Sequence, residues 1–234
     1  MNLAEVRAVV TGGGSGIGRA VAEQMVRAGG KVMICGRDGR KLAKTAEEIG
    51  ADFHVADVSS EKDVASLFEA ALSRLGSLNV LINNAGFGSF APLLEVDVAG
   101  MRGVWETNVL GAAIAAREAA RTFIRQKTAG NIINVASTAG QRGFAGGTSY
   151  VASKFALRGM TECWRAELRQ HDIRVMLINP SEVQTPFFES SGRARKLSER
   201  KLQASEIAHA IMAMLSMEDR GFITDLTVWA TNPD

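Results

Sequence analysis

A glycine-rich turn lies between an apolar strand and a helix near the start of the chain. Residues 5–11 form an apolar run typical of a buried strand, and residues 19–28 favour a helix. Between them the sequence reads Thr-Gly-Gly-Gly-Ser-Gly-Ile-Gly, over residues 11–18. Glycines let a backbone approach phosphates closely, and a helix N-terminus offers N–H groups to them. The layout predicts a dinucleotide site, although the spacing is G-x-x-x-G-x-G and a simple tight turn is the alternative.

Apolar runs alternate with helical stretches along the rest of the chain, which predicts a parallel sheet. The fold class is therefore α/β: a doubly wound, Rossmann-like parallel sheet of about seven strands with helices on both faces. No linker or repeat interrupts residues 1–234, so one domain is expected, with 186–204 as a substrate-loop segment within it. The further strands are expected at 31–35, 51–56, 78–83, 131–135, 174–178 and 222–229, and the helices at 39–49, 61–76, 98–126 and 151–168. Thr107, Asn108 and Gly111 should interrupt the helix at 98–126.

The end of the second expected strand bears on cofactor choice. It reads Gly36-Arg37-Asp38, about 20 residues past the glycines, where an adenosine ribose is expected. An acid there accepts from a ribose 2′-hydroxyl and selects NAD, whereas an arginine accommodates the 2′-phosphate of NADP. Arg37 favours NADP(H), and Asp38 keeps NAD(H) as the alternative. A solvated Arg-Asp pair in a loop is the non-functional interpretation.

Polar residues follow several other strands, at the sheet edge where ligands bind in open α/β folds. Asp57 is placed to accept from an adenine amino group or to cap the next helix, although Ser59 or Ser60 suits that cap better. Asn83 and Asn84 end the fourth strand and lead into Ala85-Gly86. Ser137 follows the fifth strand.

Tyr150 is the single tyrosine of the chain, and Lys154 follows it at helical spacing. Side chains four residues apart share one helix face, so the ammonium is expected to lower the pKa of the phenol. A lowered pKa would make Tyr150 a usable general acid and base. By itself, a tyrosine and a lysine at this spacing more often indicate only a half-buried ring beside a solvated charge.

Taken together, these residues resemble the short-chain dehydrogenase/reductase family, and in particular its 3-oxoacyl-(acyl-carrier-protein) reductase-like members. The resemblance covers about residues 5–229 and rests on Thr-Gly-Gly-Gly-Ser-Gly-Ile-Gly, Asn-Asn-Ala-Gly, Asn108, Ser137 and the Tyr150-x-x-x-Lys154 motif. It implies one NAD(P) site, a carbonyl or alcohol substrate, and a homodimer or homotetramer packed through helices 98–126 and 150–170.

The resemblance also implies roles for individual residues. Tyr150 would exchange a proton with the substrate oxygen, Ser137 would hydrogen-bond that oxygen, and Lys154 would lower the pKa of Tyr150 and bind the nicotinamide ribose. Asn108 would hold a water that links Lys154 to solvent. The cofactor-binding residues implied are Gly12, Ser15, Gly16, Ile17, Gly18, Arg37, Asp57, Val58, Asn84, Ala85, Gly86, Tyr150, Lys154, Pro180, Val183 and Thr185. Two departures from the family are Ser181, where Pro180 is usually followed by glycine, and a C-terminus without a glycine-rich end.

Composition excludes other classes of function. A net charge of +2 gives no reason to expect nucleic acid or a membrane surface as a partner. No apolar run is long enough to span a membrane, and no secretory signal is visible, so a cytoplasmic protein is expected. Cys35 and Cys163 match no metal-ligand spacing and are interpreted as buried free thiols. The three histidines also fit no metal site, so none is predicted.

The substrate is less constrained than the chemistry. Phe187-Phe188, with Phe90 and Phe144, are candidates for the lining of an apolar pocket, but core packing is the favoured interpretation for at least two of the four. The basic run 193–201 is read as a solvated helix face, with steering of an acidic substrate or carrier as the alternative. A non-catalytic NADP(H)-binding sensor is the alternative to an enzyme.

Overall fold

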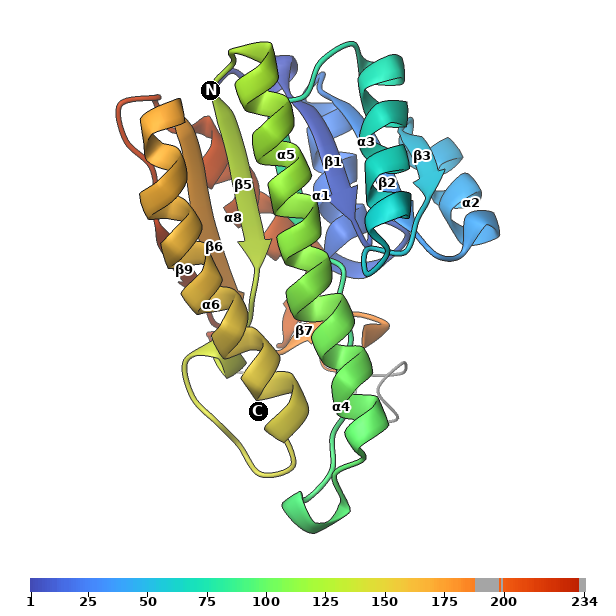
Figure 1. The fold of residues 1–234 in the computed structure, drawn as a ribbon, viewed down its shortest axis with the longest axis vertical. Coiled ribbons are helices and arrows are strands. Elements are labelled where there is room, and N and C mark those ends of the chain that lie inside the picture. Colours follow the sequence, from blue (N-terminus) through green and yellow to red (C-terminus); the bar gives the residue numbers. More distant parts are fainter. Residues whose placement is uncertain (188–197, 199, 232–234) are drawn as a thin grey trace.

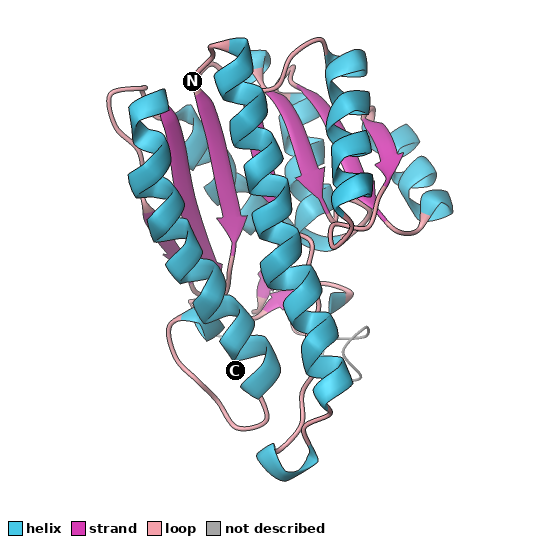
Figure 2. Ribbon diagram, in the orientation of Figure 1, coloured by secondary structure: helices cyan, strands magenta, loops and turns pink. Residues whose placement is uncertain are grey.

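Seven parallel strands form the central sheet of the computed structural model (Figures 1 and 2), which describes residues 1–187, 198 and 200–231. Their order across the sheet is β3-β2-β1-β4-β5-β6-β9. The strands are β1 Arg7–Thr11, β2 Lys31–Gly36, β3 Asp52–Val55, β4 Val80–Asn83, β5 Gly130–Val135, β6 Ile173–Pro180 and β9 Asp225–Val228. The doubly wound α/β fold expected from the sequence is thereby confirmed, with every pairing parallel.

Helices cover both faces of the sheet (Figure 1). One face packs against α1 Gly16–Arg27, α2 Gly39–Ile49 and α8 Ala204–Ser216, and the other against α3 Glu61–Leu75, α5 Ala112–Gln126 and α6 Thr148–Leu168. The central strands are buried on both sides, which is why each reads as a continuous apolar run rather than an alternating one. Because every strand runs in the same direction, their carboxyl ends all lie along one edge of the sheet.

The strand order reverses between β1 and β4. From β1 the chain winds outward through β2 to β3, and it then returns to place β4 on the other side of β1. The connection that follows β1 leads to β2 on one side, and the connection that follows β4 leads to β5 on the other side. The loops after β1 and β4 therefore diverge, and a crevice opens between them at the carboxyl edge. The glycine-rich turn after β1 and the Asn-Asn-Ala-Gly segment after β4 meet at this crevice.

The long helix expected at 98–126 is interrupted where the sequence indicated. It begins as α4 Val98–Trp105, passes through a π-helical stretch at Glu106–Gly111 and continues as α5. Asn108 is buried within that stretch. Gly111 allows the close approach of Val58, because a Cβ at Gly111 would lie 2.7 Å from a Val58 methyl carbon.

Three expectations need correction. Cys163 is exposed rather than buried, because it lies on the outer face of α6, whereas Cys35 is buried in β2. The last strand spans Asp225–Val228, shorter than expected at both ends. The segment after β6 contains elements that the sequence reading lacked: a small parallel pair of β7 Val183–Gln184 with β8 Leu202–Gln203, followed by α8.

The described residues hold neither a membrane-spanning helix nor a metal-binding cluster of side chains. None of their helices is both long enough and apolar enough to cross a membrane. Within the same ranges, no group of His, Cys, Asp and Glu side chains is arranged to hold a metal ion.

Candidate active site

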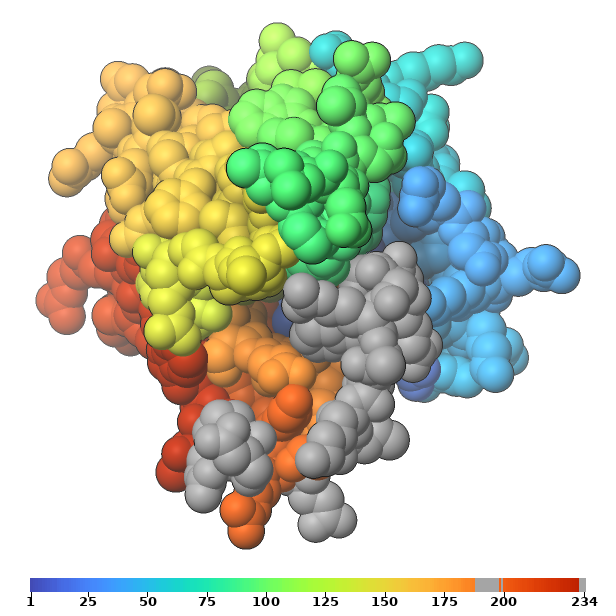
Figure 3. Space-filling view, turned by 90° about the horizontal axis from the view of Figure 1, so that it is seen from below, coloured from blue at the N-terminus to red at the C-terminus, as the bar shows by residue number. Residues whose placement is uncertain are grey.

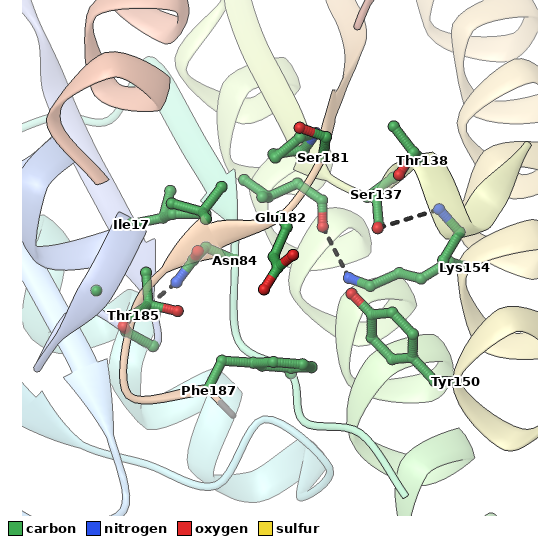
Figure 4. Close-up of a pocket in the computed structure, with 18 of the residues that line it drawn as sticks. Ile17, Asn84, Ser137, Thr138, Tyr150, Lys154, Ser181, Glu182, Thr185 and Phe187 are labelled. Carbon is green, nitrogen blue, oxygen red and sulfur yellow. Dashed lines mark hydrogen bonds between the residues drawn. The ribbon is translucent and has the colours of Figure 1, made fainter. Parts of the chain in front are cut away.

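A cavity of about 880 Å³ opens at the carboxyl edge of the sheet. Figure 3 views the molecule from this edge, where the surface is recessed between the yellow segment around the start of α6 and the orange segment after β6. Of the sequence-predicted site residues, the following line it: Gly12, Ser15, Gly16, Ile17, Asn84, Ala85, Gly86, Ser137, Tyr150, Lys154, Pro180, Val183 and Thr185. Figure 4 shows Ile17, Asn84 and Thr185 on one side of this cavity and Ser137, Tyr150 and Lys154 on the other.

The glycine-rich turn forms the first wall of the cavity. Gly12 and Gly16 both have positive φ, at 66° and 55°, which glycine adopts without strain. The Asn84 amide donates to the carbonyls of Thr11 and Gly12 at 2.9 and 3.3 Å, so it ties this turn to the end of β4. The N-terminus of α1 begins at Gly16, directly beside the cavity. These features fit the pyrophosphate of a dinucleotide.

Gly18 packs tightly behind this wall, although it does not itself line the cavity. A Cβ at this position would lie 2.5 Å from the Gly12 carbonyl oxygen and 2.5 Å from Asn84 Nδ2. We therefore expect Gly18→Ala to push the glycine-rich turn away from α1, with a loss of about 1–3 kcal/mol in the free energy of unfolding. Cofactor affinity should fall together with it. Chemical denaturation and a cofactor titration measure the two effects.

Gly159 provides a matched control for that variant. It is an exposed residue within α6, and a Cβ there meets nothing within 4 Å. Gly159→Ala should therefore stabilise the protein by about 0.5–1 kcal/mol and leave cofactor affinity unchanged. Equal cofactor affinity in Gly18→Ala and in the wild type would contradict the role given to the turn.

The end of β2 carries the residues that bear on cofactor choice. Arg37 is exposed, and it lies outside the enclosed part of the cavity. The Asp38 carboxylate caps α2 by accepting from the backbone N–H of Lys41 at 3.1 Å. The Lys41 side chain does line the cavity, and its ammonium donates to Ser15 Oγ at 3.0 Å. Two cations and an engaged carboxylate therefore lie beside the glycine-rich turn.

Asp57 and Val58 follow β3 and also lie outside the lining of the cavity. Asp57 Oδ1 accepts from the backbone N–H and the hydroxyl of Ser59, at 2.9 and 2.7 Å. Ser60, as the sequence favoured, caps α3 by accepting from the backbone of Asp63. The Asp57 carboxylate is therefore oriented by its own turn, outside the cavity lining, and its contact with an adenine stays a prediction.

Tyr150 lies near the start of α6 and faces Ser137, which follows β5. The Ser137 side chain interacts with the phenol in the sense that lowers its pKa, and Ser137 Oγ accepts from the backbone N–H of Ala139 at 3.1 Å. Burial raises the pKa of Tyr150 to about 12, and the interaction with Ser137 only partly opposes that rise. The expectation that Lys154 brings this pKa below its ordinary value is wrong for this structure, because burial among aromatic rings has the larger effect.

Lys154 lies one helical turn from Tyr150 and is itself buried, with 6% of its surface exposed. Its ammonium donates to the Val135 carbonyl at 2.9 Å and lies 5.6 Å from the centroid of the Tyr150 ring. Burial lowers the pKa of Lys154 to about 8. A partly desolvated ammonium is thus held close to the phenol at neutral pH.

Asn108 lies behind these two residues rather than in the cavity wall. Its Nδ2 donates to the Phe87 carbonyl at 2.9 Å and to Ser153 Oγ at 3.0 Å, and its Oδ1 accepts from the Phe87 backbone N–H at 3.0 Å. These bonds join the segment after β4 to α6, next to Lys154. Asn108 is thus placed to fix the position of Lys154, and the water-holding role stays a prediction.

Aromatic side chains surround Tyr150. Its ring centroid is 5.5 Å from that of Phe90 and 5.4 Å from that of Phe187, and Phe144 packs against Phe90 at 6.1 Å. All three phenylalanines line the cavity, so core packing was the wrong interpretation for them. Phe188, like Arg193, Arg195 and Lys196 of the basic run, lies outside the described residues.

Sequence reasoning missed three charged residues of the cavity wall, namely Lys41, Arg142 and Glu182. Lys41 carried a usable signal, since it lies one helical turn into the helix that follows Arg37. For Arg142 and Glu182 the only signal was that they lie close to Ser137 and Ser181 in the sequence. Ser181 also lines the cavity, and its backbone N–H donates to the Val228 carbonyl of β9 at 2.9 Å.

Comparisons with known proteins agree with this geometry. The family model for short chain dehydrogenase matches residues 6–196. Human 3-oxoacyl-[acyl-carrier-protein] reductase is 33% identical over 219 residues, which cover 88% of this chain and 89% of that protein. An oxidoreductase of Bacillus subtilis is 34% identical over 188 residues, and there the chain spans only about half, 53%, of the relative's length.

Two solved structures superpose on nearly the whole chain. An alcohol dehydrogenase from Thermococcus sibiricus, complexed with 5-hydroxy-NADP, has a TM-score of 0.88 at 27% identity and is matched over 98% of this chain and 99% of its own. A 3-ketoacyl-(acyl-carrier-protein) reductase from Brucella melitensis, complexed with NADH, has a TM-score of 0.88 at 29% identity, with 97% of each chain covered. The two neighbours thus hold different nicotinamide cofactors.

Proposed function

Because the chain belongs to the short chain dehydrogenase family and is an NAD(P)-dependent oxidoreductase, we propose that it interconverts a carbonyl compound and an alcohol with NADP(H). The observation that carries the proposal is that Tyr150 and Ser137 line one cavity wall together, with the Lys154 ammonium 5.6 Å from the centroid of the Tyr150 ring. A nicotinamide cofactor supplies the hydride for reduction and accepts it for oxidation. The protein supplies the proton, the binding and the orientation.

Tyr150 and Ser137 act together on the oxygen of the substrate. During reduction, the carbonyl oxygen accepts a hydrogen bond from Ser137 and takes the proton of the Tyr150 hydroxyl while hydride adds to the carbonyl carbon. The negative charge that develops on the oxygen is thereby neutralised. A phenol with its pKa raised to about 12 is protonated at neutral pH, which is the form that reduction needs. Lys154 stabilises the phenolate that results.

Several groups support NADP(H) over NAD(H). Arg37 and Lys41 bring two positive charges to the end of β2 and the glycine-rich turn, and both suit a 2′-phosphate. The Asp38 carboxylate, which would select NAD(H) through the ribose hydroxyl, uses one oxygen to cap α2, and its other oxygen keeps NAD(H) as the alternative. Gly12, Ser15, Ile17 and Asn84 would hold the pyrophosphate and the nearby ribose. Val183 and Thr185 would hold the carboxamide.

The dissociation constants of NADPH and NADH test the cofactor proposal. Quenching of protein fluorescence reports both, since Trp229 lies close to the cavity mouth. We expect NADPH to bind more tightly, and Arg37→Ala to weaken NADPH about tenfold or more while NADH is unaffected, because a charge-assisted hydrogen bond is worth about 1.5–3 kcal/mol. Arg169→Ala is the matched control, because Arg169 is exposed beside the amino end of β6, at the opposite edge of the sheet. Equal binding of the two cofactors, unchanged in Arg37→Ala, would favour NAD(H).

We further propose that the protein is a homo-oligomer. Large apolar side chains are exposed on the outer surface of α4, the π-helical stretch, α5 and α6. They are Trp105, Leu110, Ile124 and Phe155, each more than 40% exposed. Helices that present apolar side chains to solvent in this way are suited to packing against a second copy of the chain.

A further inference from the structure

Arg142 lies at the mouth of the cavity and is held there by the C-terminal end of the chain. Its guanidinium carbon lies 5.0 Å from the centroid of the Trp229 ring, which follows β9. The neighbouring Gln141 donates to Thr227 Oγ1 at 2.9 Å, so the loop after β5 is attached to β9 at two points. An arginine stacked on an aromatic ring keeps its N–H groups directed outward in the plane of the guanidinium.

The position of Arg142 places it away from the cofactor. The glycine-rich turn follows β1, Ser137 follows β5, and Trp229 follows β9. Because β9 is four strands from β1, at about 4.8 Å per strand, roughly 19 Å separates their ends. The catalytic Ser137 lies between them. Arg142 therefore belongs to the part of the cavity beyond the reacting carbonyl, where the substrate body would extend.

The charge of Arg142 is not neutralised within the described part of the chain. Among the described residues, no carboxylate pairs with its guanidinium. The one carboxylate in the described lining, Glu182, already pairs with Lys201, whose ammonium lies 2.7 Å from it. Lys154 adds a second positive charge deeper in the cavity. The substrate end of the cavity is thus positive at its mouth.

The cavity wall around Tyr150 is apolar. Phe90, Phe144 and Phe187 pack around the Tyr150 ring and line the cavity. Such a surface favours an aromatic or branched apolar group next to the reacting carbon. The cavity thus combines an oxygen-binding pair, an aromatic wall around it and an exposed cation at the mouth.

We propose that the substrate is a carbonyl or alcohol compound with an apolar body and an acid group, and that Arg142 binds the acid group. This proposal rests on the function proposed above and names its substrate class. Arg142 is assigned as a specificity residue, and it takes no part in proton or hydride transfer. The basic run at 193–201 is not required for this role.

Matched acid and ester substrates test the proposal. We would measure kcat/KM with 4-acetylbenzoate, 3-benzoylpropionate and the methyl ester of each, with saturating NADPH or NADH. For at least one pair the acid should be preferred about ten- to hundredfold, the expected range for one hydrogen-bonded charge pair. Arg142→Gln should reduce that preference to within about twofold, and Arg142→Lys should restore part of it. Arg169→Gln, the same change at the opposite edge of the sheet, should keep the full preference.

This experiment distinguishes a failure of the proposed reaction from a failure of the proposed role of Arg142. Reduction of acids and esters with equal kcat/KM, or an acid preference that persists in Arg142→Gln, overturns the role of Arg142 and leaves the proposed reaction intact. A binding measurement covers the case of no reduction, which would overturn the reaction itself. In it, 4-ethylbenzoate, which has no carbonyl, should bind the cofactor-saturated wild type about tenfold more tightly than Arg142→Gln. Equal binding by the two proteins would also overturn the role of Arg142.

Discussion

Tyr150→Phe should reduce kcat for carbonyl reduction by about a hundred- to ten-thousandfold, the range that general acid catalysis contributes. The substitution removes the hydroxyl that donates the proton and retains the ring. Packing against Phe90 and Phe187 should therefore survive, as should the pocket around the cofactor. The measurement is a steady-state rate with a substrate that the wild type reduces well, together with the dissociation constant of the cofactor.

The effect must be separated from misfolding and from lost binding. Thermal melting within a few degrees of the wild type, together with an unchanged cofactor dissociation constant, would assign the loss to chemistry. Ser137→Ala gives a second estimate, since removal of one hydrogen-bond donor to a developing oxyanion costs about a hundred- to a thousandfold in kcat. Turnover by Tyr150→Phe at the wild-type rate would refute the mechanism.

Most of the fold was predictable because parallel strands buried on two faces leave an unambiguous sequence pattern. The expected helix at 39–49 has the bounds of α2, with Asp38 as its cap and Gly50 as its left-handed C-cap. The sequence did not predict α8, because the start of this helix carries an unusual capping signal. Its N-cap is Gln203 in a capping box with Glu206, rather than the more common Ser, Thr, Asp or Asn.

The candidate site was predictable as a set of residues but not as an environment. Strand ends and motif spacing bring Ser137, Tyr150 and Lys154 together in any parallel sheet with this order. The pKa of Tyr150, in contrast, depends on rings that come from distant loops, so the shift predicted from the sequence had the wrong sign. The contact of Arg142 with Trp229 joins two loops with no shared motif, and only the three-dimensional structure reveals it.

The buried lysine has an energetic cost that is separate from its catalytic value. Lys154 is surrounded by protein, and its ammonium keeps one hydrogen bond, to the Val135 carbonyl. Burial lowers its pKa from 10.5 to about 8. A difference of this size between the folded and unfolded states corresponds to about 3 kcal/mol of destabilisation while the lysine is charged in both states. An active site can retain such a group only at the expense of stability.

Lys154→Met should therefore inactivate the enzyme and raise its free energy of unfolding at pH 7 by about 1–3 kcal/mol. Methionine fills a similar volume without the charge, and the loss of the hydrogen bond to Val135 keeps the gain below the full amount. The gain in the free energy of unfolding of the variant over the wild type should be fully present below about pH 8. It should shrink as pH rises from about 8 to 10.5, because there the folded wild type has released a proton that its unfolded chain still binds. Denaturant titrations of both proteins at pH 7, 9 and 10 measure this difference in the free energy of unfolding. Burial also raises the pKa values of Tyr150 and Cys35, but both groups are present in the two proteins, so their effects on the difference cancel to first order. A variant that is less stable than the wild type at pH 7, with a deficit that does not change with pH, would mean that the ammonium stabilises the fold.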